Sequence, residues 1–275
     1  MDYIVWDMDR IIFQIYGPFG IRWYSLFFLT GFLIGLNVFQ KMARSEGQDD
    51  SYADNLLFYL IIGTIVGARL GHCLFYQPEF FLRYPLEILK VWEGGLASHG
   101  GFLGVICAIW LFVSKNKSLS FLWVADRISF LALMTGGFIR IGNLFNSEIV
   151  GRITDVPWAI IFKKVDSYPR HPSQLYEAIG YFTISLCVYS YYRYCNRRPL
   201  EGRLLGLTLA GGFAFRSFIE IFKENQVSFE ENMLMNMGQL LSIPFILLGL
   251  YLAVGLQKKK VQIKDKANSK LSYKV

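Results

Sequence analysis

The stretch RIGNLFNSE, from Arg140 to Glu148, places a guanidinium, two amides and a carboxylate directly after the uncharged run FLALMTGGFI. Arginine is always charged, and its paired donors match a phosphate or a carboxylate. A second arginine, Arg216, stands four residues before Glu220 in FRSFIEIF, so these two side chains are neighbours on one helix face. A structural ion pair explains Arg216 and Glu220 equally well at this stage. The residue types in both stretches favour the binding of an anion.

Two histidines add groups that can accept a proton near neutral pH. His99 lies in GGLASHGG, where the glycines permit close packing of helices. His171 lies in RHPSQLYE, where Pro172 is typical of a first helical turn and the polar residues can serve as capping groups. We expect His99 to be the better candidate for a general base, with His171 second. A histidine that is only satisfied at an interface is the alternative for His99.

The elements that carry these residues are long apolar runs. Apolar residues make up 53% of the chain and charged residues 18%, below the roughly 25% of soluble domains. A membrane-spanning helix needs about 20 apolar residues. The sequence therefore predicts an all-α polytopic membrane protein of about seven transmembrane helices, at residues 20–39, 53–75, 98–114, 121–139, 175–192, 203–222 and 237–256.

The charge distribution predicts which way these helices run. With the N-terminus outside, fifteen lysines and arginines fall on the inner side and nine on the outer side, as the positive-inside rule favours. Residues 1–257 then form one transmembrane catalytic domain with outer segments at about 76–97 and 140–174. The apolar, β-branched run at 156–162 predicts a short strand or an interfacial segment. Residues 258–275 form a basic tail on the cytoplasmic side, beside anionic lipid.

Under this topology each of the seven helices carries polar residues near its outer end, so these residues share one depth. Asp126 and Arg127 lie at the inner end and receive a structural or topological role. Scattered structural residues have no reason to share a depth, so the pattern indicates one site at the outer membrane boundary. The residues at the outer end are Tyr24, Arg69, His72, His99, Arg140, Asn143, Asn146, Glu148, His171, Gln174, Glu177, Arg216, Glu220 and Gln239.

Other functional classes fit the sequence less well. The four cysteines, Cys73, Cys107, Cys187 and Cys195, have neither metal-knuckle nor disulfide spacing, so they indicate neither a metal site nor a disulfide framework. The net charge of +7 reflects the tail and does not indicate a nucleic-acid partner. A transporter or flippase for an anionic lipid or small anion is the main alternative, although such proteins keep polar groups near the midplane, often at broken helices. A structural scaffold does not explain the one-sided polar ring.

The motifs together resemble the bacterial prolipoprotein diacylglyceryl transferase family. The resemblance rests on six blocks in one order: WY at 23–24, GGLASHGG at 94–101, RIGNLFNSE at 140–148, RHPSQLYE at 170–177, FRSFIEIF at 215–222 and MGQLLSIP at 237–244. It implies a multi-pass enzyme of the bacterial inner membrane with a periplasmic N-terminus. The implied reaction moves the diacylglyceryl group of phosphatidylglycerol, a membrane lipid, onto the lipobox cysteine thiol of a prolipoprotein signal peptide. The products are a thioether and glycerol phosphate, and no cofactor is implied.

The resemblance implies catalytic roles for His99, Arg140, Arg216 and Glu220, and substrate-binding roles for Tyr24, Asn143, Asn146, Glu148, Gly151 and His171. From their chemistry we expect Arg140 and Arg216 to hold one phosphate, Asn143 to add a neutral donor, and Glu148 and Glu220 to orient the arginines. His99 binds the lipid headgroup if it is not the base. The chain departs from the family pattern at Ser147, where glycine is usual, at Ser25, where the family often has glycine, and at Lys223, where arginine is common.

Overall fold

The structure is a computed structural model that describes residues 3–16, 19–49, 51–91, 95, 97–224 and 235–255. The chain divides into two compact units, one made of residues 1–38 and 126–275 and the other of residues 39–125. Two long helices, α1 (Trp23–Ser45) and α5 (Phe121–Asn146), contribute to both units. Each unit is described by itself below.

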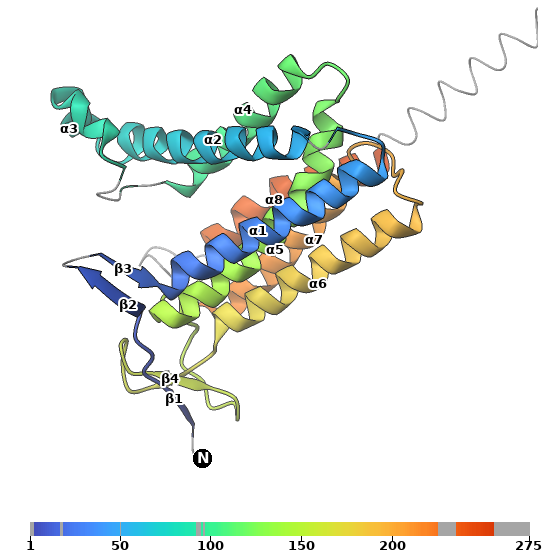
Figure 1. The fold of residues 1–275 in the computed structure, drawn as a ribbon. Helices are drawn as coiled ribbons and strands as arrows, with labels where there is room; N and C mark the ends of the chain where they lie inside the picture. Colours follow the sequence, from blue (N-terminus) through green and yellow to red (C-terminus); the bar gives the residue numbers. More distant parts are fainter. Residues whose placement is uncertain are drawn as a thin grey trace, which may run out of the picture. The chain divides into compact units, whose positions relative to one another are not determined.

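The first unit is a bundle of helices that lie side by side (Figure 1). Besides the parts of α1 and α5 that belong to it, the bundle contains α6 (Ser173–Tyr194), α7 (Arg203–Ile219) and α8 (Met237–Leu250). A 3-10 turn, Glu220–Phe222, continues α7, and a π-helical turn, Tyr251–Gly255, continues α8. Small residues allow close packing between helices, because a Cβ added to Gly206 would lie 2.5 Å from the backbone nitrogen of Ala253.

A buried carboxylate fixes the end of this bundle at which α7 begins. Asp126 accepts hydrogen bonds from the backbone nitrogens of Gly202 and Leu205, both at 2.8 Å. These donors lie at the start of α7, where backbone N–H groups have no partner within the helix. Asp126 of α5 therefore caps α7 from a neighbouring helix, which confirms the structural role that the sequence gave it.

Short strands lie beyond the end of the bundle at which α5 ends and α6 begins. In one sheet β1 (Ile4–Trp6) pairs in parallel with β4 (Ile160–Phe162), and β4 pairs with β5 (Pro169–Arg170) in antiparallel. The strand expected within 156–162 is thus confirmed as β4. A separate hairpin consists of β2 (Ile11–Tyr16) and β3 (Phe19–Arg22). Neither β1 nor the hairpin was expected from the sequence.

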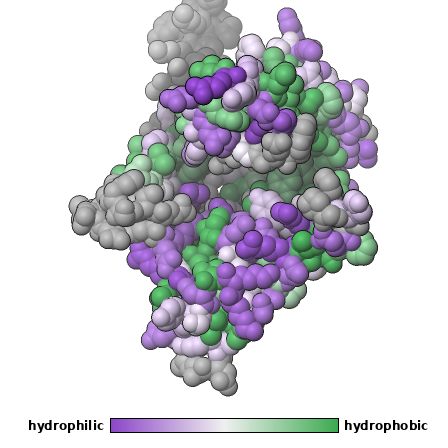
Figure 2. Space-filling view, turned by 90° about the vertical axis from the view of Figure 1, so that its left-hand side faces the viewer, coloured by the Kyte–Doolittle hydropathy of each residue, from purple (hydrophilic) through white to green (hydrophobic). Residues whose placement is uncertain are grey.

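The chain between α5 and α6 carries β4 and β5, and we call residues 147–172 the strand segment. A small apolar cluster anchors this segment to α5. Leu144 near the end of α5 packs with Ile160 and Phe162 of β4, and Trp6 of β1 packs against them. Hydrophilic side chains cover much of the strand-bearing end, with apolar patches between them (Figure 2). The cluster therefore fixes the polar residues that follow Leu144.

The second unit is built around the pair α2 (Ser51–Phe75) and α4 (Ser98–Lys115). Their glycines touch backbone to backbone: a Cβ on Gly67 would lie 2.4 Å from the carbonyl oxygen of Gly100, and one on Gly104 would meet the carbonyl of Gly63. Helices in a membrane gain much of their packing from such small-residue contacts. The glycines around His99 therefore have the packing role that the sequence suggested for them.

Buried Arg69 near the end of α2 holds the segment that follows. Its Nε donates to the carbonyl of Ile88 at 2.9 Å and its Nη2 to the carbonyl of Glu87 at 2.6 Å, and its guanidinium lies 5.1 Å from the ring centroid of Phe81. These contacts fix α3 (Pro78–Arg83) and the 3-10 helix Pro85–Leu89 against α2. Arg69, one of the outer-end polar residues, thus has a role in positioning this segment.

The predominantly helical fold predicted from the sequence is confirmed, and the seven expected segments are helical in their described parts except for residues 20–22, which belong to β3. Among the described residues, five helices are long and apolar enough to cross a membrane: Trp23–Ser45, Ser51–Phe75, Phe121–Asn146, Arg203–Phe222 and Met237–Val254. The apolar helix His99–Lys115 is shorter, and α6 carries more polar residues. The number of spans and the sidedness of the termini stay predictions, and the expected tail at 258–275 lies outside the described residues.

Candidate anion site in the helical bundle

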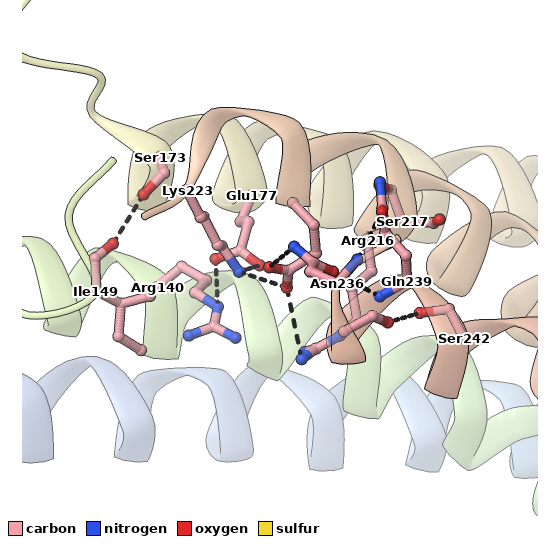
Figure 3. Close-up of polar contacts among 12 residues, drawn as sticks. Arg140, Ile149, Ser173, Glu177, Arg216, Ser217, Lys223, Asn236, Gln239 and Ser242 are labelled. Atoms are coloured by element: carbon pink, nitrogen blue, oxygen red, sulfur yellow. Dashed lines mark hydrogen bonds and ion pairs between the residues drawn. The ribbon is translucent and has the colours of Figure 1, made fainter. Parts of the chain in front are cut away.

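Arg140 lies near the C-terminal end of α5 and is held by two side chains. Its Nε lies 2.9 Å from Oε2 of Glu177 on α6, and its Nη1 donates to Oδ1 of Asn143 at 3.2 Å. Only 16% of the Arg140 side chain is exposed. The terminal nitrogens of the guanidinium point away from Glu177 (Figure 3). Arg140 is thus held at Nε by an ion pair and at Nη1 by a hydrogen bond.

Glu177 is the most deeply buried member of this group, with 0% of its side chain exposed. Its Oε1 accepts from Nζ of Lys223 at 2.9 Å and from the hydroxyl of Tyr181 at 3.3 Å. Lys223 is also buried, and its Nζ donates to Oε1 of Glu220 at 3.2 Å. One ammonium group is therefore shared by two carboxylates, so each of these buried charges has an opposite charge beside it.

Glu220 connects this group to the second arginine. Its Oε1 lies 3.7 Å from Nη2 of Arg216, one turn earlier on α7, and its Oε2 accepts from Nδ2 of Asn236 at 3.5 Å. The ion pair expected at Arg216 and Glu220 is present. We use the name five-residue ion chain for Arg140, Glu177, Lys223, Glu220 and Arg216, which alternate in charge (Figure 3). Three cations and two carboxylates leave it with one excess positive charge.

Asn143 joins Arg140 to the turn after α5. Its oxygen faces Arg140, and its Nδ2 donates to Oε2 of Glu148 at 3.1 Å. Oε1 of Glu148 also accepts from Nδ2 of Asn146 at 3.3 Å. The carboxylate that contacts Arg140 is therefore Glu177, where the sequence argument expected Glu148. Glu148 is connected to Arg140 through Asn143.

Ser147 takes a backbone conformation that favours glycine. Its φ is 54°, in the left-handed region, where most L residues carry a steric cost. The departure at this position therefore does not prevent a left-handed turn. Its Oγ is buried and has no hydrogen-bond partner among the described residues.

Gly151 lies where two backbone segments come close together. Its N–H donates to the carbonyl of His171 at 3.0 Å, and a Cβ at this position would lie 2.6 Å from that carbonyl oxygen and 2.7 Å from the carbonyl oxygen of Phe222. Arg152 then donates from Nε to the carbonyl of Lys223 at 2.6 Å. This arrangement fastens the strand segment to the residue that bridges Glu177 and Glu220.

His171 belongs to an aromatic group beside this contact. Its Nδ1 lies 3.1 Å from the hydroxyl of Tyr176, which accepts from Nε1 of Trp158 at 2.6 Å. The His171 ring packs edge-on against Phe222 with a centroid distance of 5.2 Å. Burial lowers the pKa of His171, because the charged imidazolium loses hydration there. His171 is therefore neutral at pH 7.

Tyr24 and His99 occupy different units. Half-buried Tyr24 at the start of α1 packs closely on Gly142 of α5, where an added Cβ would lie 2.9 Å from its Cδ2. Exposed His99, near the start of α4, lines an apolar cavity of about 960 Å³ formed by α2 and α4 in the second unit. The structure thus brings together the predicted residues of the first unit, and the approach of His99 to the arginines stays a prediction.

The sequence places Glu177 and Lys223 near the site, but we predicted no role in it for either residue. A usable signal existed for Glu177, because Ser173, Glu177, Tyr181 and Ser185 recur every four residues and all are buried on one face of α6. Gln239, by contrast, forms a capping box with Asn236 and donates from Nε2 to the carbonyl of Ser217 at 3.2 Å. Within the described residues, no three His, Cys, Asp or Glu side chains are grouped to hold a metal ion.

Fold and site together define a predominantly helical membrane protein in which two arginines from different helices belong to one buried ion chain. The model of the prolipoprotein diacylglyceryl transferase family matches residues 10–255. The chain therefore belongs to this family.

Individual relatives agree with this assignment. The phosphatidylglycerol–prolipoprotein diacylglyceryl transferase of Tolumonas auensis is 46% identical over 259 residues, which are 94% of this chain and 100% of the relative. The protein of the same name from Chloroherpeton thalassium is 45% identical, covering 91% of this chain and 93% of the relative. That from Bacteroides fragilis is 42% identical, covering 94% and 96%.

Proposed function

We propose that this protein transfers the diacylglyceryl group of phosphatidylglycerol to the lipobox cysteine thiol of a prolipoprotein. A carbon–sulfur bond forms as the carbon–oxygen bond to the phosphate breaks, so the products are a thioether and glycerol phosphate. The names of the relatives support a transferase over a transporter. The structural observation that supports it most directly is the five-residue ion chain, which links Arg140 of α5 to Arg216 of α7.

The two arginines fit the charge that the reaction creates. Phosphatidylglycerol carries a phosphodiester anion, and glycerol phosphate gains further charge as it leaves. Fixed guanidinium groups stabilise such charge without reorganising during the reaction. The excess positive charge of the ion chain favours the anion, and the edge-on hold by Glu177 leaves the terminal nitrogens of Arg140 directed elsewhere. We assign Arg140 and Arg216 to the phosphate, with Glu220 orienting Arg216.

Substrate-binding roles follow for the residues around Arg140. Asn143 and Glu148 continue the hydrogen bonds from Arg140 to the turn where Asn146 lies. We assign these three residues to the headgroup side of the lipid, together with Tyr24, Gly151 and His171.

The direct test combines purified protein, phosphatidylglycerol and a lipobox peptide, followed by mass spectrometry of the peptide. We expect the peptide to gain the mass of one diacylglyceryl group, and a peptide with serine in place of the cysteine to gain nothing. Movement of the lipid across a vesicle membrane without peptide modification would instead support the transporter alternative.

We assign His99 to the removal of the thiol proton, because the thiolate is the reactive form of cysteine. A His99→Gln variant should lose about 10²–10⁴-fold in rate, as expected for a general base. The loss should shrink as pH rises toward the thiol pKa of about 8.5. A loss of lipid binding with a rate deficit that does not change with pH would make His99 a headgroup ligand instead.

We place the protein in the bacterial inner membrane with seven spans, a periplasmic N-terminus and a cytoplasmic tail. The charge bias of fifteen to nine supports this orientation. Residues 1–257 then form the catalytic domain, with periplasmic segments at 76–97 and 140–174. A single cysteine placed in the tail of a variant without its native cysteines should resist labelling from outside intact cells. Ready labelling there would reverse the topology.

A further inference from the structure

The hold on Arg140 is unusual for a buried arginine–carboxylate pair. A carboxylate that binds the two terminal nitrogens occupies the fork with which arginine otherwise binds phosphate. Glu177 instead contacts Nε at 2.9 Å, and the terminal nitrogens point away from it (Figure 3). Glu177 therefore orients the guanidinium without occupying its terminal nitrogens, of which Nη1 donates to Asn143.

Lys223 holds Glu177 in the position from which Glu177 orients the Arg140 guanidinium. Glu177 and Glu220 both lie within 3.2 Å of the Lys223 ammonium. Without this cation the two carboxylates would face each other in a buried place, where like charges repel strongly because water does not screen them. With it, the position of Glu177, and hence of Arg140, is coupled to the position of Glu220, and hence of Arg216.

Lys223 is itself fixed by the strand segment. Its carbonyl oxygen accepts from Arg152 Nε, and its backbone forms an isolated bridge with Gly151. The buried ammonium has carboxylate partners on both sides. This geometry makes Lys223 a bridge between two carboxylates.

We propose that Glu177 is a positioning residue for Arg140, and that Lys223 couples it to Glu220 so that both arginines hold one phosphodiester at a fixed spacing. This inference rests on the proposed function and extends it to two residues that act through the arginines. It predicts that the pair affects the chemical step more than the folding of the bundle.

The test replaces the pair by apolar residues in the double variant Glu177→Met/Lys223→Met. A buried ion pair exchanged for apolar residues of similar volume often leaves stability unchanged or raised. The double variant also keeps the net charge of the ion chain at one positive charge. The variant leaves Arg140 without Glu177 and Glu220 without Lys223, so we expect a folded protein whose unfolding temperature is somewhat below that of the wild type. Its kcat for thioether formation should fall about 10²-fold, the size of effect that a small misplacement of a catalytic group produces.

Further variants separate positioning from structure. KM for phosphatidylglycerol should change less than kcat in the double variant, since both arginines remain. Lys223→Arg keeps a cation between the carboxylates and should retain kcat within about threefold, because an arginine can bridge them as well. The matched control is Asp7→Asn/Lys163→Gln, which removes an exposed ion pair of 3.3 Å in the strand segment and should leave kcat unchanged.

The outcomes are distinct. A folded double variant with wild-type kcat would overturn the positioning role. If the double variant does not fold, Glu177→Asp decides, because it keeps the charge but withdraws the carboxylate from Arg140. A reduced kcat with an unchanged unfolding temperature supports the proposal, and a wild-type kcat overturns it. The wild type runs in every assay, so that absence of thioether there refutes the proposed function and not this inference.

Discussion

Asp126 and Glu177 are two carboxylates with 0% exposure, at opposite ends of the same bundle, and their partners differ in kind. Asp126 accepts from two backbone N–H groups at the start of α7. Glu177 is paired with two side-chain cations, Arg140 and Lys223. A backbone N–H has one hydrogen to donate, so the two groups that bind Asp126 have none left for another partner. A guanidinium that contacts a carboxylate keeps further N–H groups that can bind a second anion. The comparison teaches that burial alone does not mark a functional carboxylate, and that the identity of its partners does.

The largest expected effect is on activity at the outer end. Arg140→Lys removes both the Nε contact with Glu177 and the Nη1 contact with Asn143. A lysine ammonium is a point charge and cannot replace the planar fork. We expect the transfer rate to fall about 10²–10³-fold, as when one preorganised donor to a developing oxyanion is removed. Near-normal turnover, measured by mass spectrometry of the peptide, would contradict this contrast. The carboxylate with side-chain partners would then be no more tied to activity than the one with backbone partners.

At the inner end the expected effect is on stability. Asp126→Ala leaves the N–H groups of Gly202 and Leu205 buried without their acceptor. Each unpaired donor costs about 1–3 kcal/mol. The free energy of unfolding in detergent should fall accordingly, while kcat per folded molecule stays at the wild-type value. A fall in kcat at full folding would give Asp126 a part in the reaction.

A smaller effect sharpens the comparison at the turn after α5. Ser147→Gly removes the steric cost of a φ of 54° and the buried hydroxyl, so we expect stabilisation by about 1 kcal/mol. The matched control, Ser190→Gly at an exposed position before the last turn of α6, should destabilise by roughly 0.5 kcal/mol because glycine is a poor helix former. Thermal unfolding of both variants measures the difference. Destabilisation by Ser147→Gly would show that the serine side chain has a partner of its own.

The smallest effect is the pH dependence of stability at His171. Burial lowers its pKa in the folded protein below the usual value of about 6.5. The unfolded chain therefore binds this proton more readily, and stability falls as pH drops through 6.5 toward the folded value. Above pH 6.5 the contribution is fully present. His171→Gln should make the unfolding temperature less dependent on pH between about 5 and 7, and an unchanged slope would assign the dependence to other groups.

Much of this fold could be predicted from the sequence because long uncharged runs have few alternatives to helices. The boundaries at 53–75 and 98–114 nearly coincide with α2 and α4. The sheet could not be predicted, because β1 pairs with a strand more than 150 residues later and its three residues carry little pattern of their own. The anchoring of Trp6 to β4 arises only once the bundle has brought these segments together.

The site shows the same division. Arg140, Arg216 and Glu220 were predicted by residue type, and their helices place them in one ion chain. The partner of Arg140 was not predicted, because it depends on how α6 is rotated against α5. Glu148 was the nearest carboxylate along the chain, but the turn at Ser147 directs it toward Asn143 and Asn146.

The backbone contact between α2 and α4 has a consequence for how this chain can change during evolution. A methyl group on Gly67 would meet the carbonyl oxygen of Gly100 at 2.4 Å, so even alanine requires the helices to separate. The neighbouring side chains Ile62, Val66 and Leu70 face the apolar cavity and meet no such limit. We therefore expect orthologous sequences to vary freely among apolar types at 62, 66 and 70, while mutation at 67 is removed by selection.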